Sequence, residues 1–315
     1  PMEDVSDPPF RRLCKMHGAD MMYSEFISSE GLIRDAMKSR KKLDIFDYER
    51  PVGIQIFGGD EEAMAMSARI VETVNPDLVD INFGCPVKKV VCKGAGAGVL
   101  KDIDLMVRLT KAVVSSTSLP VTVKTRLGWD STSINIDEVA ERLQETGIKA
   151  LTIHARTRAQ MYKGEADWEH ISRIKQNPNI EIPIFGNGDI DSPEKALEYK
   201  QKYACDGIMI GRAAIGYPWI FNEIKHFFKT GEHLPAPKIE DRLLAVRQHA
   251  EWSAEWKGEK LGLIEMRQHY SNYFRGVPHF KDFRKKFLEV FTLEEMDALI
   301  HETQAFYSDY LAQQV

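Results

Sequence analysis

Seven short apolar segments recur along the first 235 residues of the chain. They span residues 21–27, 52–57, 78–83, 120–126, 150–155, 182–186 and 207–211. Near-continuous apolar runs of this length are typical of parallel strands that are covered on both faces. Amphipathic stretches with helical spacing lie between them, and a chain in which strands and helices alternate folds as an α/β protein.

Two kinds of signal place helices between these strands. Met66, Ile70 and Val74 repeat at i, i+4 spacing after an acidic start, which predicts the apolar face of a helix. Ser192 followed by Pro193 predicts an N-cap and the first residue of another helix.

The number of strands distinguishes between two α/β architectures. We expect an eighth strand to precede Pro1, and eight strands in about 235 residues predict a (β/α)8 TIM barrel. An open Rossmann sheet is disfavoured because no GxGxxG motif follows a first strand.

The periodicity changes after Pro235 and Pro237, which flank a short linker. The pattern beyond them is helical throughout, which predicts helices over 240–256, 260–275, 280–289 and 293–312. We therefore predict a barrel domain over 1–235 and an all-helical domain over 238–315.

Charge is distributed unevenly along the chain. The formal net charge is −5, so an overall basic footprint for nucleic acid is absent. Residues 260–290, however, contain seven Lys or Arg against three acidic residues. This local excess predicts a basic surface on the helical domain.

Composition also argues against several classes of protein. The sequence has no run of about 18 apolar residues, and its first residues lack the basic and apolar parts of a signal peptide. The cysteines form no CxxC pair and no zinc-ribbon spacing. We expect a monomeric protein of the reducing cytoplasm, without a membrane partner or a bound metal.

Polar residues stand where the predicted strands end. In a TIM barrel the chemistry lies in the loops at the carboxyl ends of the strands. One or two such residues could be ordinary buried polar groups, but a set that converges on one rim indicates a site. The set comprises Glu25, Gln55, Asn82, Cys85, Lys124, Arg126, His154, Arg156, Asn187, Asp189 and Arg212.

Glycine-rich turns follow the last two predicted strands, at 185–190 and 210–216. Loops at these places in a barrel commonly bind phosphate with backbone N–H groups. Gly188 and Gly211 would permit close approach, and Arg212 would add a charged donor. Each turn could also be an ordinary tight connection, but the pair favours a cofactor that carries a phosphate.

Two residues have competing interpretations. Lys124 could form a Schiff base, as in barrel aldolases, or stand as a permanent cation beside an electron-rich ring. The amides of Gln55 and Asn82 suit the edge of a heterocycle and favour the ring. Cys85 could be a nucleophile paired with His154, a proton donor or an inert buried residue; its Gly-Cys-Pro setting at a strand end favours a functional thiol.

Seven ordered motifs together resemble the tRNA-dihydrouridine synthase family, and the helical tail is most similar to its bacterial B-type branch. The motifs are PME at the start, QIFG (55–58), DINFGCPVKKV (80–90), VKTRLGW (123–129), IHARTR (153–158), GNGDI (186–190) and GRAAIG (211–216). The resemblance implies an FMN-dependent enzyme that uses NADPH to reduce the C5–C6 bond of specific uridines in tRNA to 5,6-dihydrouridine.

The resemblance also implies roles for residues. Cys85 would protonate C5 of uracil, Lys124 would lie by the N1/O2 edge of the flavin, and Gln55 would bind its pyrimidine edge. The other cofactor-binding residues would be Pro1, Met2, His154, Asn187, Gly188, Asp189, Gly211 and Arg212. The substrate-binding residues would be Asn82, Arg156, Arg158, Tyr162, Lys285 and Lys286.

A uridine inside folded RNA must be flipped out to reach such a pocket, which requires a further RNA-binding surface outside the pocket. Lys88, Lys89 and Lys93 flank Cys85, and the basic stretch 260–290 suits phosphate contact. Aromatic residues within that stretch could read RNA shape or could form the helical core. They are Tyr270, Tyr273, Phe274 and Phe283.

Three other functions compete with this interpretation. A flavin-dependent oxidoreductase of a free pyrimidine would use the same barrel but would not need the basic helical tail. A Schiff-base aldolase would be colourless and would use Lys124. A non-catalytic RNA-binding module would need neither Cys85 nor a cofactor-binding rim.

Overall fold

The computed structural model describes residues 1–312 and divides into two compact units. The first contains Pro1–Asp7 and Asp20–Gly211, and the second contains Pro8–Ala19 and the described residues from Arg212 onward. This division differs from the predicted boundary at 235–238. Helix α1 (Pro8–Met16) contacts α11 (Ile239–Lys257) and buries Leu13 in the core of the second unit, which explains why an N-terminal segment groups with the C-terminal helices.

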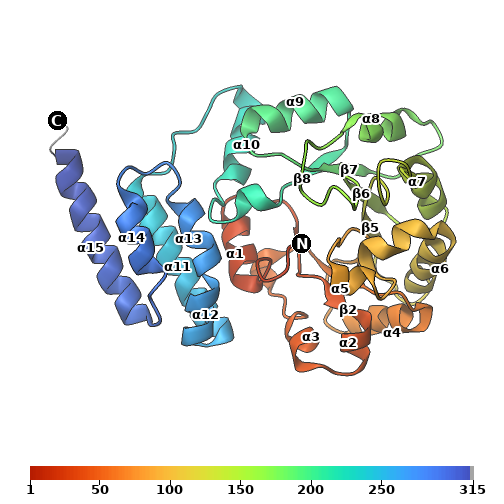
Figure 1. The fold of residues 1–315 in the computed structure, drawn as a ribbon, viewed down its shortest axis with the longest axis horizontal. Coiled ribbons are helices and arrows are strands. Elements are labelled where there is room, and N and C mark those ends of the chain that lie inside the picture. The colour runs from red at the N-terminus through yellow and green to blue at the C-terminus, as the bar shows by residue number, and fades with distance from the viewer. Residues whose placement is uncertain (313–315) are drawn as a thin grey trace. The chain divides into compact units, whose positions relative to one another are not determined.

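The first unit is built on a parallel sheet whose strand order follows the chain (Figure 1). The predicted TIM-barrel class is confirmed, and each of the seven predicted segments contains a strand. The strands are β1 (Met22–Tyr23), β2 (Ile27–Ser28), β3 (Val52–Phe57), β4 (Leu78–Asn82), β5 (Val121–Arg126), β6 (Ala150–His154), β7 (Ile184–Asn187) and β8 (Gly207–Met209).

The first predicted segment differs in detail from the prediction. Residues 21–27 do not form one strand: β1 and β2 are two short strands that both pair with β3, at its beginning and at its end. The path of paired strands runs from β1 to β8, so within residues 1–312 the strands form the wall of a barrel rather than a closed ring.

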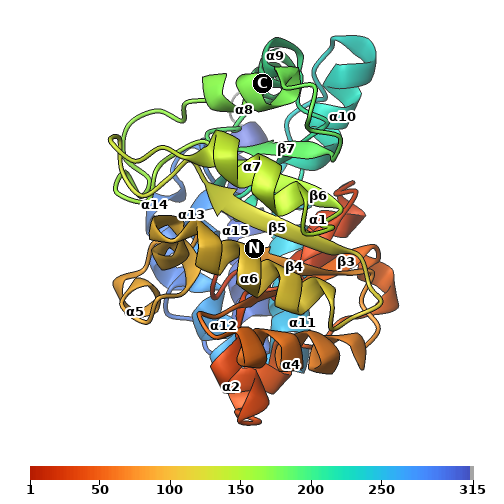
Figure 2. The same ribbon diagram turned by 90° about the vertical axis from the view of Figure 1, so that its right-hand side faces the viewer.

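Helices cover the outer face of this wall (Figure 2). The longer ones are α4 (Glu61–Glu72), α6 (Ile103–Val114), α7 (Ile136–Gln144), α8 (Glu169–Gln176) and α9 (Pro193–Tyr203). The same unit also contains the short helices α2 (Ser29–Ile33), α3 (Met37–Lys41), η1 (Asp47–Glu49), α5 (Lys88–Val91) and η2 (Gly96–Lys101).

Two helix predictions have different outcomes. Ser192 caps α9, because its hydroxyl accepts the Lys195 N–H at 3.3 Å and Pro193 opens the helix. The predicted apolar face of α4 is wrong: Met66 is exposed, and α4 packs through the smaller side chains of Ala63 and Ala68 together with other buried residues. The face of α4 that packs inward is marked by Met64, Ala68 and Val71, which are fully buried and follow the i, i+4, i+7 spacing of one helix face.

The second unit is helical. Its elements besides α1 and α11 are η3 (Arg212–Ala214), α10 (Ile220–Thr230), α12 (Glu259–Glu265), α13 (Arg267–Tyr273), α14 (Phe280–Phe287) and α15 (Leu293–Ala312). The predicted helix over 260–275 is therefore two helices that meet at Met266. No helix among residues 1–312 is both long and apolar enough to span a membrane.

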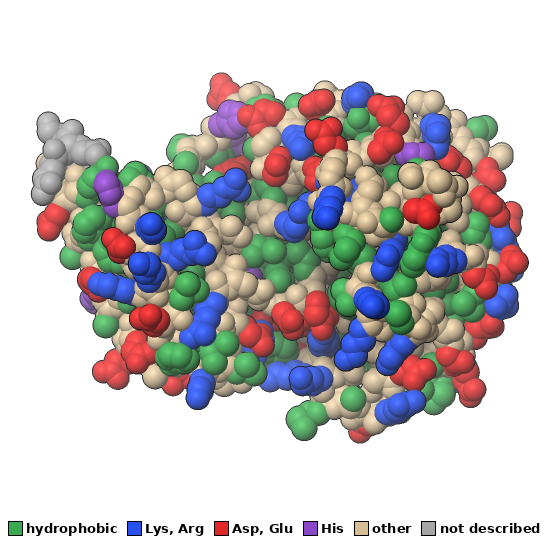
Figure 3. All heavy atoms as spheres, viewed as in Figure 1, with side chains coloured by type: hydrophobic (Ala, Val, Ile, Leu, Met, Phe, Trp, Pro, Cys, Tyr) green, Lys and Arg blue, Asp and Glu red, His purple; other side chains and the backbone are tan. Residues whose placement is uncertain are grey.

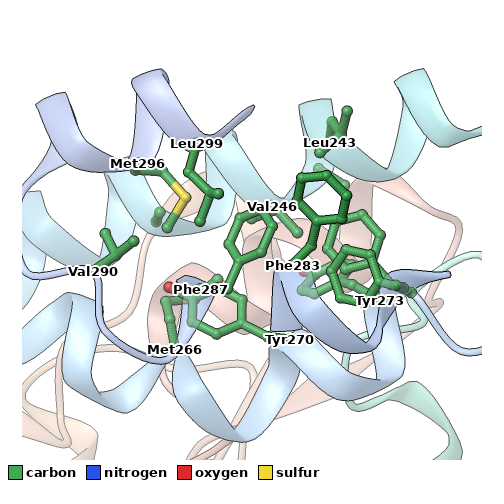
Figure 4. Close-up of a cluster of buried hydrophobic side chains, with 14 of the residues drawn as sticks. Leu243, Val246, Met266, Tyr270, Tyr273, Phe283, Phe287, Val290, Met296 and Leu299 are labelled. Carbon is green, nitrogen blue, oxygen red and sulfur yellow. The ribbon is translucent and has the colours of Figure 1, made fainter. Parts of the chain in front are cut away.

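The core of the second unit is rich in aromatic side chains (Figure 4). Tyr270, Tyr273 and Phe287 are fully buried, and Phe283 is 7% exposed. The suggestion that Tyr270, Tyr273, Phe274 and Phe283 read RNA shape is therefore wrong, because all four pack inside the unit.

The core predicts unequal effects on stability for two adjacent leucines of α11. Leu243 is 2% exposed and Leu244 is 59% exposed. Leu243→Ala should lower the free energy of unfolding by about 2–5 kcal/mol because it leaves a cavity, whereas Leu244→Ala should change it by less than about 0.5 kcal/mol. Urea unfolding followed by fluorescence would measure both, and equal effects would contradict this description of the core.

Candidate active site

The register of the sheet brings the strand-end residues together. Asn82 pairs with Lys124 across β4 and β5, and Arg126 pairs with His154 across β5 and β6. His154 in turn pairs with Asn187 on β7. Side chains of residues paired in this way lie on the same face of a sheet. The carboxyl ends of β4–β7 therefore present one continuous row of polar groups.

Cys85 lies in the loop that follows β4 and is 6% exposed. The backbone N–H groups of Gly84 and Cys85 donate to the side-chain oxygen of Asn82 at 2.8 and 3.0 Å. The carbonyl of Cys85 accepts the Ala97 N–H at 3.0 Å. Burial raises the pKa of the Cys85 thiol, so at neutral pH this residue is a protonated acid rather than a thiolate nucleophile.

Lys124 lies on β5 beside Asn82 and is partly buried. Among residues 1–312 its ammonium makes no hydrogen bond or ion pair with another side chain or the backbone. Burial, assisted by the nearby Arg126 guanidinium, lowers the pKa of Lys124 to about 8. A partly buried cation without an internal partner is suited to an anionic or electron-rich ligand.

Arg126 connects two loops of the rim. Its Nε donates to the Gly84 carbonyl at 2.7 Å, and its Nη1 donates to the carbonyls of Thr157 and Met161 at 3.0 and 2.9 Å. The arginine therefore ties the Cys85 loop to the loop after β6. The sequence marked Arg126 only as a polar strand end, and its carbonyl partners carry no signal in the sequence.

Arg156 is buried, and its guanidinium makes hydrogen bonds to other residues of the protein. It donates to Asp189 at 2.6 Å and to the carbonyl of Gly164 at 2.5 Å. Asp189 also accepts the Ala166 N–H at 2.9 Å. These contacts hold the segment 157–166 against the turn after β7, so Arg156 is placed to support that segment rather than to face a substrate.

Tyr162 and Arg158 are the more accessible residues of this segment. Tyr162 is 52% exposed, and its ring lies 5.6 Å from the Arg126 guanidinium and 6.2 Å from the His154 ring. Arg158 lies over the Trp129 ring at 4.6 Å. Tyr162 is therefore an exposed aromatic surface at the rim, next to His154.

The turn after β7 is shaped by its glycine. Gly188 has φ +126°, and an added Cβ would lie 2.9 Å from Ala166 and 3.2 Å from the His154 ring. Asn187 holds the neighbouring strand, because its amide donates to the Met209 carbonyl at 2.8 Å.

The turn after β8 is open at its glycine. A Cβ at Gly211 would meet only the Met2 sulfur, at 3.8 Å, so Met2 lies beside this turn. Pro1 precedes Met2, and its predicted role remains a prediction. Arg212 opens the second unit and is exposed, and its phosphate-binding role likewise remains a prediction.

Exposed basic residues follow Cys85 and also occupy α14. Lys88, Lys89 and Lys93 are exposed around α5, and Cys92 is exposed among them. On α14, Lys285 and Lys286 are exposed, and Lys286 is ion-paired with Glu302. Figure 3 shows Lys and Arg side chains over both elements.

The sequence matches a known family over nearly its whole length. The family model described as dihydrouridine synthase matches residues 1–309. The tRNA-dihydrouridine synthase B of Pseudomonas putida is 41% identical, with 98% of this chain and 90% of the relative covered. The protein of the same name from Vibrio vulnificus is 40% identical, with 91% and 88% covered.

Solved structures with little sequence similarity share the fold. Histamine dehydrogenase from Rhizobium sp. 4-9 aligns with a TM-score of 0.55 at 9% identity, covering 79% of this chain and 46% of that one. The 6-hydroxypseudooxynicotine amine oxidase of Pseudomonas geniculata aligns with a TM-score of 0.56 at 13% identity, covering 88% and 50%. This chain spans about half of each, and the likeness shows the barrel architecture alone.

Proposed function

The chain belongs to the dihydrouridine synthase family, and from this premise we propose that it reduces specific uridines of tRNA to 5,6-dihydrouridine. Cys85 is the proposed proton donor, with flavin as the cofactor. The observation that carries the proposal is the buried Cys85 thiol, which lies in a loop held by Asn82 through the Cys85 backbone N–H, on the same rim as the Lys124 ammonium. A free pyrimidine substrate is the weaker candidate because the curated relatives are named for tRNA.

The residues of the rim fit a flavin mononucleotide. Lys124 offers a cation that has no ion-pair partner among the described residues, which suits the electron-rich pyrimidine edge of a flavin. The open turn at Gly211 leaves room for a phosphate. When bound, the flavin supplies the two electrons that reduce the C5–C6 bond of uracil, and NADPH is the proposed source of those electrons. We propose Gln55, His154, Asn187, Gly188 and Asp189 as further residues of the cofactor site, together with Pro1, Met2 and Arg212.

Cys85 completes the reduction by donating its thiol proton to C5 of the base. A thiol suits this step only if it is protonated before the reaction, and burial of Cys85 provides that condition. The Asn82 side chain fixes the loop that carries the thiol. The lowered pKa of Lys124, about 8, gives a larger neutral fraction than an ordinary lysine has and would itself suit a Schiff base. The family membership disfavours that alternative, because the relatives are named as dihydrouridine synthases.

The substrate uridine must leave its stack to reach this rim. We propose that exposed Tyr162 contacts the flipped nucleotide and that Arg158 contacts the RNA nearby. Arg156 and Arg126 act indirectly, because they hold the segment that carries these two residues. Lys88, Lys89 and Lys93 are placed to contact phosphates beside the Cys85 loop.

We propose that the second unit binds tRNA. On α14, the buried Phe280, Phe283 and Phe287 leave Arg284, Lys285 and Lys286 on the exposed side. A row of cations on a helix suits the phosphate backbone of RNA. We further propose that the protein acts as a monomer in the reducing cytoplasm, where unpaired cysteines such as Cys85 and Cys92 persist.

The role of Cys85 can be tested against a second cysteine of the same segment. Cys85→Ala should still bind FMN and accept electrons from NADPH, but dihydrouridine formation on tRNA should fall about 10²–10⁴-fold, the usual worth of a placed general acid. Cys92→Ala should have little effect because Cys92 is exposed beyond the site. The measurements are flavin reduction followed by absorbance and a single-turnover tRNA assay. Parent-like uridine reduction by Cys85→Ala would refute the assignment.

The role of Lys124 predicts a pH dependence of cofactor binding. The Lys124 ammonium has a pKa of about 8, so its charge is present below that pH and is lost above it. The dissociation constant of FMN should therefore rise between pH 7.5 and 9.5, by at most about tenfold per pH unit. Fluorescence titration would measure it. Lys124→Met should bind FMN weakly at every pH in this range, and a parallel pH profile in that variant would show that Lys124 is not responsible.

The α14 surface predicts a change in tRNA binding with salt. Replacing Arg284, Lys285 and Lys286 by Ala should weaken binding and reduce the slope of log K against log salt by about two to three. The control replaces Lys38, Arg40 and Lys41 of α3, which are exposed and carry the same total charge. NADPH oxidation without tRNA should be nearly unchanged in both variants. Equal losses of tRNA affinity in the two variants would mean that net charge alone is responsible.

A further inference from the structure

Three side chains form a hydrogen-bonded line from the interior of the barrel to the Cys85 loop. Asp80 on β4 accepts a hydrogen bond from the Gln55 Nε2 on β3 at 2.5 Å. The Gln55 Oε1 accepts one from the Asn82 Nδ2 at 2.9 Å. The Asn82 Oδ1 accepts the N–H groups of Gly84 and Cys85. All three side chains are buried, with exposures of 0–6%.

The two ends of this line fix the orientation of both amides. A carboxylate can only accept, so Gln55 must turn its NH2 group toward Asp80. A backbone N–H can only donate, so Asn82 must turn its oxygen toward Gly84 and Cys85. The central hydrogen bond then has its donor on Asn82 and its acceptor on Gln55, which agrees with both ends. Along the line, each donor therefore points from the Cys85 loop toward Asp80.

We propose that Asp80 is a positioning residue that sets the direction of this Asp80–Gln55–Asn82 relay and so holds the Cys85 loop in place. The Asp80 carboxylate does not reach the loop itself. It acts by making Gln55 present an oxygen to Asn82, which leaves the Asn82 oxygen for the two backbone N–H groups. As a consequence, Asn82 can offer a bound ligand only its second N–H.

The groups around Asp80 explain how the interior of the barrel tolerates an acidic side chain. Thr122 on β5 donates to its second oxygen, and the Lys124 ammonium lies near enough to favour the charged form. Burial raises the pKa of Asp80, and the hydrogen bonds from Gln55 and Thr122 oppose that rise. Packing alone would not select a carboxylate here, because burying one carries a desolvation penalty.

The relay can be tested by two isosteric changes. In Asn82→Asp, the Gln55 oxygen must face a carboxylate on one side or the other, which leaves one pair of groups without a hydrogen bond in a buried place. In Asp80→Asn, the introduced amide can keep its oxygen toward Gln55 and turn its NH2 group toward Thr122, whose hydroxyl can accept as well as donate. We therefore expect Asn82→Asp to be damaging and Asp80→Asn to be tolerated.

The double variant Asp80→Asn/Asn82→Asp restores every hydrogen bond with the direction reversed. The amide introduced at position 80 would donate to the Gln55 oxygen, and Gln55 would donate to the carboxylate introduced at position 82. That carboxylate would still accept the N–H groups of residues 84 and 85. The composition and net charge are those of the parent. The proposal therefore predicts that Asp80→Asn, tolerated by itself, rescues the damage caused by Asn82→Asp.

The test uses the whole protein without added cofactor, so it does not depend on activity. Hydrogen exchange of the segment that contains Gly84 and Cys85, and alkylation of Cys85 by iodoacetamide, should both be about tenfold faster in Asn82→Asp, as expected for the loss of a buried hydrogen bond. Both rates should stay close to those of the parent in Asp80→Asn. Cys92, which is exposed, should be alkylated at the parent rate in all variants. In the double variant both rates should return to within about threefold of the parent.

Two results would overturn the proposal. One is parent-like exchange and alkylation in Asn82→Asp. The other is a double variant whose losses are the sum of the two single losses, which would mean that the sites act independently. If Asn82→Asp does not fold, a folded double variant is itself the rescue, and a double variant that also fails to fold counts against the relay.

The inference concerns the thiol loop, and only its consequence for catalysis rests on the proposed function. Uridine reduction in a single turnover should fall in Asn82→Asp and recover at least in part in the double variant. If the parent protein makes no dihydrouridine but the exchange pattern holds, the proposed function fails and the relay remains.

Discussion

The parallel register of β4, β5 and β6 is the constraint on which the site depends. It sets Asn82 beside Lys124 and Arg126 beside His154, so that residues far apart in the sequence lie side by side on neighbouring strands. A shift of one residue in any of these strands would turn its polar side chains to the outer face. The apolar residues that alternate with them, such as Val123 and Ile153, are fully buried and oppose such a shift.

Burial then gives opposite effects on the two ionisable groups of the rim. It favours the neutral form of both, so it raises the pKa of the Cys85 thiol and lowers the pKa of the Lys124 ammonium to about 8. The thiol thereby keeps the proton that it has to donate. The ammonium stays mostly charged at neutral pH, yet it is poorly solvated and open to a ligand. Burial thus keeps the thiol protonated and leaves the ammonium on the same rim charged but poorly solvated.

The strands and the strand-end residues could be predicted from the sequence, because periodicity and position carry that information. The hydrogen-bond partners could not. Arg126 binds the carbonyls of Gly84 and Met161, which are 42 and 35 residues away, and any residue type offers the same carbonyl. The burial of Arg156 and the buried face of α4 escaped prediction for a related reason: both depend on which segments the fold brings against them.

The aromatic and basic residues of α14 illustrate how packing can decide between two interpretations of a sequence. Phe280, Phe283 and Phe287 follow helical spacing and are buried, so the intervening basic residues must lie on the other side of the helix. The aromatic side chains cannot contact RNA, yet their burial is the reason that Lys285 is exposed. The core of the second unit therefore creates the basic surface: the two features that seemed to compete for one function are the inner and outer faces of the same helix.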